Sequence, residues 1–515
     1  MHSETLGFDA KGLFVPRSRG HAHRATIHLF SRLAFISVIL LSSALPGQAQ
    51  GPWRPEVEAL LNSMTPEPRG EQPGFPGFAA AVIHRGKLSF VGTKGMANLE
   101  HQVPIGSTTS FRIGSTSKQF TATAIALLHL DGDIKLDDLL TNHFPKLAQA
   151  APGVLISDLV HHTSGITDYL VLAFLNGNSD QDIYSVEDSF SQLCQQRDLM
   201  FEPGTKFYYS NSNYFLLSLL VQRISGQSLA DFAAKRIFKP LGMKNSRYRK
   251  AYDEIIPNRA HGYRQTKAAW RIANTQLDHT GDGGVFTTIE DLAKWDANFY
   301  DNKLGHGKAL IDLLQRRGCL RNGDPLDYAF GLVVDRHRGR QRVAHGGAFV
   351  GFRADYVRFP ELETSVVCLG NYARSRASII CSSIVDIVLR DSWEPLEKRK
   401  QPSQPFRSHT KAPPLPDPKP QPRTASPMAS YNGEYVCEAL RVPWTIEAIS
   451  DTPLPGLRFV IGHNRIQLSR ARGDHFGPEA FRCLFRRNQH GDVTGFGLYS
   501  GLGFPFEFKR KDKTS

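Results

Sequence analysis

A serine and a lysine three residues apart stand at the start of a strong helical pattern. Ser115 and Lys118 precede an apolar periodicity that begins at Phe120, recurs at helical spacing to Leu128 and stops at Gly132. A spacing of three at a helix start places the serine hydroxyl and the lysine amine on one face. Serine becomes a nucleophile when a base takes its proton, and a desolvated lysine can act as that base. The pair indicates acyl transfer through Ser115, although a capping serine beside a surface lysine has the same spacing.

Two further polar segments follow along the chain. Tyr209-Ser210-Asn211 offers a phenol that can relay a proton and an amide that can hydrogen-bond a substrate carbonyl. The alternative is a tyrosine-rich turn that caps the next helix. His345-Gly346-Gly347-Ala348 precedes the late strands, where glycines let a substrate backbone lie along a strand edge. The N–H groups of Ala348 and Ser115 could together form an oxyanion hole, and a plain glycine-rich turn is the alternative.

Apolar periodicity predicts the elements that must position these residues. Residues 77–98 have the pattern of a β-hairpin, and two late strands and several helices follow. The helices are expected at residues 214–224, 229–237, 289–299 and 377–389, and the late strands at 352–359 and 364–370. Strands at both ends with helices between them predict an α/β (α+β) domain, in which distant segments complete one antiparallel sheet flanked by helices.

Composition divides the rest of the chain. Ten of the 31 prolines fall between Pro395 and Pro427, where fixed φ angles and missing amide donors favour an extended spacer. We therefore expect a main domain at residues 50–392, a proline-rich linker at 393–429 and a second domain at 430–515. Short alternating runs between glycine turns predict that the second domain is a small all-β barrel or sandwich.

Residues 1–49 have the pattern of an export signal. Basic residues precede the uncharged apolar run 33–45, and small residues end at Ala49. The run is shorter than the roughly 20 residues of a membrane span. We expect a Sec signal peptide cleaved near Ala49, a secreted or periplasmic protein and no stable span after cleavage; an uncleaved anchor is the alternative. In an oxidising compartment cysteines can pair, and Cys437 with Cys483 is the pair to test first.

The net charge of +13 does not by itself indicate a polyanion partner. Only +3 of it falls within residues 50–392, where aromatic residues do not alternate with runs of Lys and Arg. We therefore expect no nucleic-acid partner. The chain has no Cys-x-x-Cys or His-Glu-x-x-His spacing, so we expect no metal, and no cofactor of another kind is expected either.

Taken together, the three polar segments resemble the class C β-lactamase-like and penicillin-binding serine hydrolase family over about residues 70–392. That family carries Ser-x-x-Lys, then Tyr-x-Asn, then Lys-Thr-Gly or His-x-Gly on a strand. The resemblance implies Ser115 as the acylated nucleophile, Lys118 as its base, Tyr209 as proton relay and Asn211 as amide binder. Residues 345–348 would line the substrate strand, whereas His161, His162 and Thr163 are expected to shape the fold.

One position departs from the β-lactamases of this branch, because His345 stands in place of a permanently charged lysine. The resemblance to members with His-x-Gly implies a D-aminopeptidase or an esterase, and the former carry β-barrel domains. We expect a serine hydrolase that acts on small amides, D-amino acid peptides or esters. Peptidoglycan could supply such a small-molecule or peptide substrate. The alternatives are a β-lactamase or D-alanyl-D-alanine carboxypeptidase and, in another class, a non-catalytic peptidoglycan-binding or sensor protein.

Overall fold

A computed structural model describes most of the chain. The described residues are 51–68, 74–179, 182–279, 281–394, 427–449, 456–462, 464–472, 474–477, 481–500 and 506–511. The expected signal peptide and nearly all of the expected linker lie outside these residues. Among the described residues, no helix is long and apolar enough to cross a membrane.

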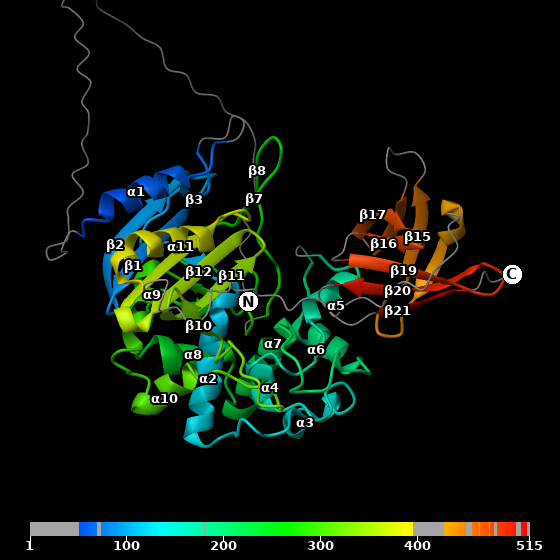
Figure 1. Cartoon of the computed structure of the whole chain (residues 1–515), viewed down its shortest axis with the longest axis horizontal. Coiled ribbons are helices and arrows are strands. Elements are labelled where there is room, and N and C mark those ends of the chain that lie inside the picture. The colour runs from blue at the N-terminus through cyan, green and yellow to red at the C-terminus, as the bar shows by residue number, and fades with distance from the viewer. Residues whose placement is uncertain are drawn as a thin grey trace, which may run out of the picture. The chain divides into compact units, whose positions relative to one another are not determined.

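A six-stranded antiparallel sheet forms the centre of the main domain (Figure 1). Its order is β10-β11-β12-β13-β1-β2, so the first strands of the domain pair with the last. The strands are β1 (Phe78–His84), β2 (Lys87–Lys94), β10 (Val333–His337), β11 (Arg340–Phe349), β12 (Phe352–Phe359) and β13 (Thr364–Gly370). The prediction of one antiparallel sheet completed by distant segments is confirmed.

Helices cover both faces of this sheet. Helices α1 (Arg54–Ser63) and α11 (Ala377–Val388) pack on one face, as Figure 1 shows, and α9 (Ile289–Asn298) packs against β1, β2 and β13. The buried Asp296 of α9 fixes this contact, because its carboxylate accepts hydrogen bonds from Arg358 Nε at 2.9 Å and from the Tyr356 hydroxyl at 2.8 Å. A buried charge needs such partners, and here they lock α9 to β12.

A helical lobe holds the nucleophile. Helix α2 (Lys118–Asp131) is buried along nearly its whole length and packs against α7 (Asn211–Ser225), α8 (Leu229–Ala233) and α10 (Gly307–Leu314). Gly132 ends α2 with a φ of 87°, a conformation that glycine adopts without strain. The remaining helices are α3 (Leu140–His143), α4 (Ile156–Val160), α5 (Tyr169–Leu175) and α6 (Val186–Cys194).

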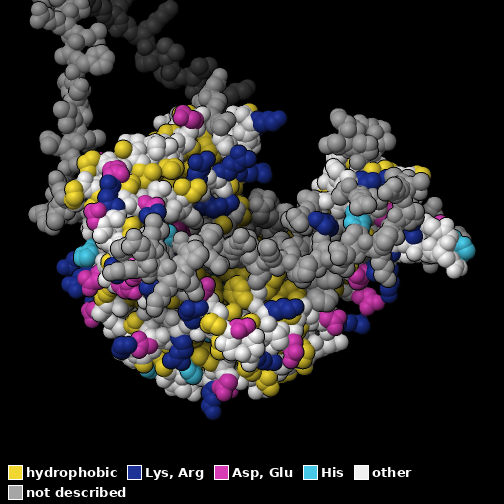
Figure 2. All heavy atoms as spheres, viewed as in Figure 1, with side chains coloured by type: hydrophobic (Ala, Val, Ile, Leu, Met, Phe, Trp, Pro, Cys, Tyr) yellow, Lys and Arg dark blue, Asp and Glu magenta, His cyan; other side chains and the backbone are white. Residues whose placement is uncertain are grey.

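Lys and Arg side chains are interspersed with Asp and Glu over α8 and α10 (Figure 2).

Short strands complete the main domain. They are β3 (Met96–Asn98) with β4 (Val103–Pro104), β7 (Tyr263–Gln265) with β8 (Trp270–Ile272), and β5 (Phe111–Arg112), β9 (Val285–Thr287) and β6 (Arg247–Tyr248) in a three-stranded sheet. Strand β5 leads directly into the residues around Ser115. The small sheet therefore fixes the approach to the nucleophile.

The C-terminal domain is a closed eight-stranded barrel. Its strands are β14 (Gly433–Val436), β15 (Trp444–Ile449), β16 (Gly456–Ile461), β17 (Asn464–Arg472), β18 (His475–Phe476), β19 (Phe481–Arg487), β20 (Val493–Ser500) and β21 (Phe506–Arg510). Buried aromatic rings fill its interior, with Trp444 at 4.5 Å and Phe496 at 4.4 Å from Phe508 between ring centroids. Side chains fill a barrel of this size, and closure removes the exposed strand edges.

Cys437 and Cys483, the pair to test first for a disulfide, do not form one in the structure. Both are buried free thiols in the barrel, and the other four cysteines are also free. Burial raises the pKa of both barrel thiols above the ordinary value, since a thiolate would be desolvated there. These two cysteines therefore act as small apolar core residues.

Candidate active site

The Ser115 hydroxyl and the Lys118 amine meet at the start of α2. Residues Gly114–Ser117 form a 3-10 turn that leads into the α-helix, so Ser115 lies one tight turn before Lys118. Lys118 Nζ donates a hydrogen bond to Ser115 Oγ at 3.2 Å. The sequence predicted that both side chains share one face, and the structure brings them into contact.

Lys118 is held in a buried, hydrogen-bonded position. Besides Ser115, its amine donates to the Asn211 Oδ1 atom at 2.9 Å and to the Asp282 carbonyl oxygen at 2.7 Å. Burial lowers the pKa of Lys118 from 10.5 to about 8, although the carboxylates of Asp282 and Asp168 act in the opposite direction. A lysine with this pKa is partly neutral near physiological pH, and the neutral amine can accept the serine proton.

Asn211 is oriented by a buried carboxylate. Asp168 Oδ2 accepts hydrogen bonds from the Asn211 backbone N–H at 2.7 Å and from its Nδ2 at 2.9 Å. The side-chain oxygen of Asn211 is thereby turned toward Lys118. One amide hydrogen remains for another acceptor, because an NH₂ group donates two hydrogen bonds. The role of Asn211 in binding a substrate carbonyl stays a prediction.

Tyr209 lies over the lysine and is fixed from behind by a histidine. Its ring centroid is 4.9 Å from Lys118 Nζ and 4.3 Å from the ring of His162. Burial raises the pKa of Tyr209 well above 10, although the nearby Ser115 hydroxyl acts in the opposite direction, and the Tyr209 hydroxyl has no hydrogen-bond partner among the described residues. The phenol thus stays protonated beside the nucleophile. Such a group can donate a proton to a leaving group.

His162 is structural, as expected, but its contact with Tyr209 connects it to the site. It has a φ of 58°, and its Nδ1 atom lies 3.0 Å from Asn213 Nδ2 and 3.3 Å from the Ser210 amide nitrogen. Both nitrogens are donors, so Nδ1 accepts and the ring is neutral. Burial lowers the pKa of His162 well below 6.5, in agreement with that assignment.

Strand β11 lies against the nucleophile segment because Gly347 has no side chain. A Cβ atom at Gly347 would lie 1.9 Å from the Ile113 carbonyl oxygen. Close by, a Cβ atom at Gly114, whose φ is 50°, would lie 3.0 Å from the Ala348 amide nitrogen. Gly347 is thus required by this close approach, and Ala348 stands next to the residue that precedes Ser115.

The Ala348 N–H points away from the neighbouring strand. A two-residue turn joins β11 to β12 and closes on the pair Phe349 and Phe352. Such a hairpin closes on a hydrogen-bonded pair, and hydrogen-bonded and non-hydrogen-bonded pairs alternate along the ladder. Ala348 and Arg353 are therefore a non-hydrogen-bonded pair. This leaves the Ala348 N–H on the open edge of β11, where an oxyanion hole needs a donor.

His345 is buried and neutral. Its Nδ1 donates to the Gly346 carbonyl at 2.7 Å, because that oxygen can only accept, and Nε2 accepts from the Tyr328 hydroxyl at 3.0 Å. Burial, assisted by the charge of Lys118, lowers the pKa of His345 to about 4. At the position where β-lactamases of this branch carry a permanently charged lysine, this site therefore has no cation near neutral pH.

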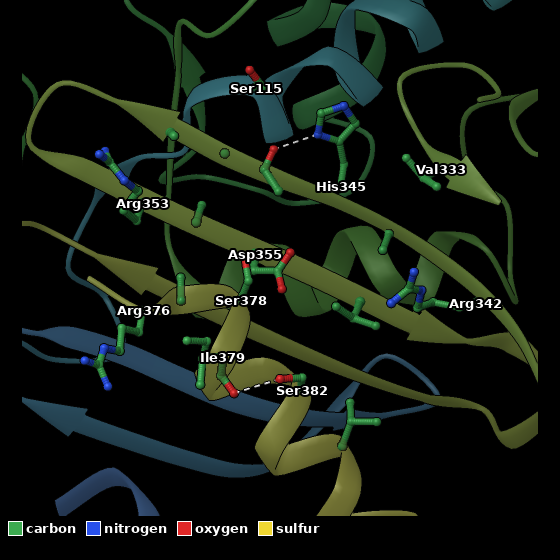
Figure 3. A pocket seen from close by; sticks show the side chains of 18 of the residues that line it. Ser115, Val333, Arg342, His345, Arg353, Asp355, Arg376, Ser378, Ile379 and Ser382 are labelled. Atoms are coloured by element: carbon green, nitrogen blue, oxygen red, sulfur yellow. Dashed lines mark hydrogen bonds between the residues drawn. The ribbon is translucent and has the colours of Figure 1, made fainter. Parts of the chain in front are cut away.

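A cavity of about 980 Å³ adjoins these groups. Ser115, Tyr209 and residues 344–348 of β11 line it, and it continues over β12 toward the first turn of α11 (Figure 3). Figure 3 shows Ser115 and His345 at one end of this cavity and Arg376 and Ser382 at the other. A ligand much larger than a single amino acid fits in this space.

Sequence reasoning missed three residues that support the site. Asp168 orients Asn211, the backbone of Asp282 holds Lys118, and Tyr328 fixes His345. The Asp282 carboxylate also accepts a hydrogen bond from the Tyr169 hydroxyl at 3.0 Å. None of the three lies in a polar segment that the sequence singled out, and their contacts with the site span 17 to 164 residues.

The fold is that of the penicillin-binding proteins, and the contact between Ser115 and the buried Lys118 is the arrangement expected of a serine hydrolase. The chain belongs to the beta-lactamase family, whose model matches residues 65–378.

The chain is also similar to individual proteins whose names state an activity. A D-aminopeptidase from Gluconobacter oxydans is 30% identical over 329 residues, which are 64% of this chain and 62% of that protein. The chain thus matches less than two thirds of the length of this relative. The octameric penicillin-binding protein homologue from Pyrococcus abyssi has a TM-score of 0.56 and 21% identity, covering 88% of this chain and 99% of its own. The D-amino acid amidase from Ochrobactrum anthropi has a TM-score of 0.53 and 21% identity, and the match covers 66% of this chain and 98% of the amidase.

Proposed function

We propose that this protein hydrolyses small amides, D-amino acid peptides or esters through an acyl-enzyme on Ser115. The observation that carries the proposal is the 3.2 Å contact between Ser115 Oγ and a lysine amine whose pKa burial lowers to about 8. A capping serine beside a surface lysine would lack both features. Here the lysine is fully buried and held by two further acceptors.

Acylation begins when neutral Lys118 takes the Ser115 proton. The serine oxygen forms a bond to the substrate carbonyl carbon, and the carbonyl electron pair moves onto its oxygen. The N–H groups of Ser115 and Ala348 stabilise that oxyanion, whose charge the start of α2 also favours. Collapse of the tetrahedral intermediate breaks the bond to the leaving group.

The leaving group needs a proton when it is an amine. The protonated Tyr209 phenol lies beside the nucleophile and can donate this proton, which Lys118 then replaces. A water molecule next attacks the ester carbon, gives a proton to the same pair of residues and releases the acid. Ser115 regains its proton in this step, so the cycle closes without any cofactor.

The neutral His345 supports amides and esters as substrates. A D-alanyl-D-alanine terminus or a penicillin presents a carboxylate, which a cation would bind far better than a neutral imidazole. The named activities of the relatives, D-aminopeptidase and D-amino acid amidase, support a preference for substrates of D-configuration.

We further propose that the chain is exported after cleavage near Ala49, on the basis of the apolar run 33–45. N-terminal sequencing of protein recovered from the cell envelope or medium tests export, and an intact N-terminus would contradict it.

A substrate panel tests the proposed activity. We expect kcat/KM for a D-alanine anilide to exceed that for its L-isomer by at least about tenfold, with ester hydrolysis also present and nitrocefin turnover slow. Ser115→Ala is the matched control for each substrate. Preference for the L-isomer or faster nitrocefin turnover would contradict the substrate assignment, and the second result would favour a β-lactamase. If the protein turns over none of these substrates, or if Ser115→Ala turns them over equally well, the result would favour the binding-protein alternative.

A further inference from the structure

Three arginines surround a small cavity beside the strand that leads to Ser115. Arg112 lies in β5 and Arg249 directly follows β6. Arg259 forms an isolated β-bridge with Ser110, the residue before β5. All three side chains line a cavity of about 10 Å³. This volume holds about one sphere of the size of a water molecule.

Arg112 is buried and incompletely satisfied. It is 4% exposed, its Nε donates to the Gly283 carbonyl at 2.9 Å, and its guanidinium lies 4.3 Å from the centroid of the Phe349 ring. Its Nη1 atom is buried and has no hydrogen-bond partner among the described residues. A buried guanidinium N–H without an acceptor is costly, so Nη1 indicates a missing acceptor in the cavity.

The other two arginines do not supply an acceptor. Arg249 donates to the carbonyl oxygens of Leu277 at 2.6 Å and Thr275 at 3.3 Å. Within the described part of the chain, no carboxylate lies within 4.0 Å of any of the three guanidinium groups, and Arg259 makes no side-chain hydrogen bond. Three positive charges thus share a site without an ion pair.

Burial and mutual repulsion act on these charges. Burial, together with the charge of Arg249, lowers the pKa of Arg112 to about 9. The carboxylate of Asp282 raises the pKa of Arg112 and that of Asp278 raises the pKa of Arg249, so each offsets part of the lowering. The pKa of Arg259 is also lowered by burial. A bound negative charge would remove this penalty.

We propose that this cavity binds one monatomic anion, chloride, between Arg112, Arg249 and Arg259. The cavity has no room for a whole phosphate or carboxylate group, and Phe286, Phe349 and Phe352 also line it. An anion there accepts from the free Arg112 Nη1 and offsets one of the three positive charges. It joins β5, the loop at Arg259 and the β11–β12 hairpin, which together flank Ser115.

Thermal unfolding of the whole chain in sodium chloride and in sodium gluconate, at equal ionic strength and neutral pH, tests the site. Chloride should raise Tm progressively with its concentration, because a ligand at ten times its dissociation constant raises the folded-to-unfolded ratio about elevenfold. Arg259→Gln should weaken this response. Arg271→Gln removes an exposed arginine of β8 outside the cavity and should leave it unchanged.

Crystals soaked in bromide give a second readout that does not depend on a variant folding. We expect an anomalous difference peak within hydrogen-bond distance of Arg112 Nη1. A water molecule at that position without anomalous signal would overturn the proposal. Equal Tm values in chloride and gluconate, or a chloride response that Arg259→Gln does not alter, would overturn it as well.

Discussion

The neutral fraction of Lys118 should set the rate at which Ser115 is acylated. Burial lowers the pKa of Lys118 to about 8, so raising the pH through this value converts the ammonium into the base. One group with this pKa is about 1% neutral at pH 6, about 9% at pH 7 and about 90% at pH 9. The second-order rate of acylation should therefore rise about tenfold from pH 6 to pH 7 and level off near pH 9.

The burst of nitrophenol from an activated ester measures this rate on the free enzyme. The histidines cannot produce the same limb, since burial lowers the pKa of His345 to about 4 and that of His162 well below 6.5. Lys118→Arg keeps a positive charge that does not titrate in this range, so it should remove the limb and slow acylation about 10²- to 10⁴-fold. A flat profile between pH 6 and 9 would refute the reasoning, and so would an unchanged limb in Lys118→Arg.

Three further substitutions test individual contacts. Ser115→Ala should abolish turnover and lower the free energy of unfolding by only about 1 kcal/mol, because it removes one side-chain hydrogen bond. A large loss of Tm would show a mainly structural serine. Tyr209→Phe keeps the ring and should lower kcat for an anilide about 10²-fold, but less for a nitrophenyl ester whose leaving group needs no proton; equal losses would contradict a proton relay. Gly347→Ala should lower both Tm and kcat, because its Cβ would lie 1.9 Å from a carbonyl oxygen. Gly346→Ala, with its nearest contact at 3.6 Å, should retain Tm, and similar effects of the two glycine variants would contradict the close approach of β11.

Much of the fold could be predicted because local patterns agree with the tertiary structure. The expected strands at 352–359 and 364–370 coincide with β12 and β13, and the hairpin and α9 were placed within a few residues. The helix expected at 229–237 ends as an α-helix at Ala233 and continues as a π-helical turn to Phe238. Apolar periodicity shows that this segment is buried, but it does not distinguish the two hydrogen-bond patterns.

The supporting residues of the site could not be predicted in the same way. Asp168 has a local explanation as the cap of α5, where it accepts from the Leu170 N–H, and its second bond to Asn211 spans 43 residues. Tyr328 lies in a segment without clear periodicity, and its contact with His345 depends on tertiary packing. The low pKa of His345 likewise follows from burial, which depends on tertiary packing and not on the residues beside it in the sequence.

Intact-protein mass spectrometry tests the central claim most directly. The chain is exposed separately to a fluorophosphonate and to a penicillin, with Ser115→Ala as the control. The account predicts one fluorophosphonate adduct that maps to Ser115 and is absent from the variant, with no stable penicilloyl adduct. Labelling that persists in Ser115→Ala, or no labelling by either reagent, would contradict an active Ser115, whereas a stable penicilloyl adduct at Ser115 would leave the nucleophile in place and contradict the reasoning from His345.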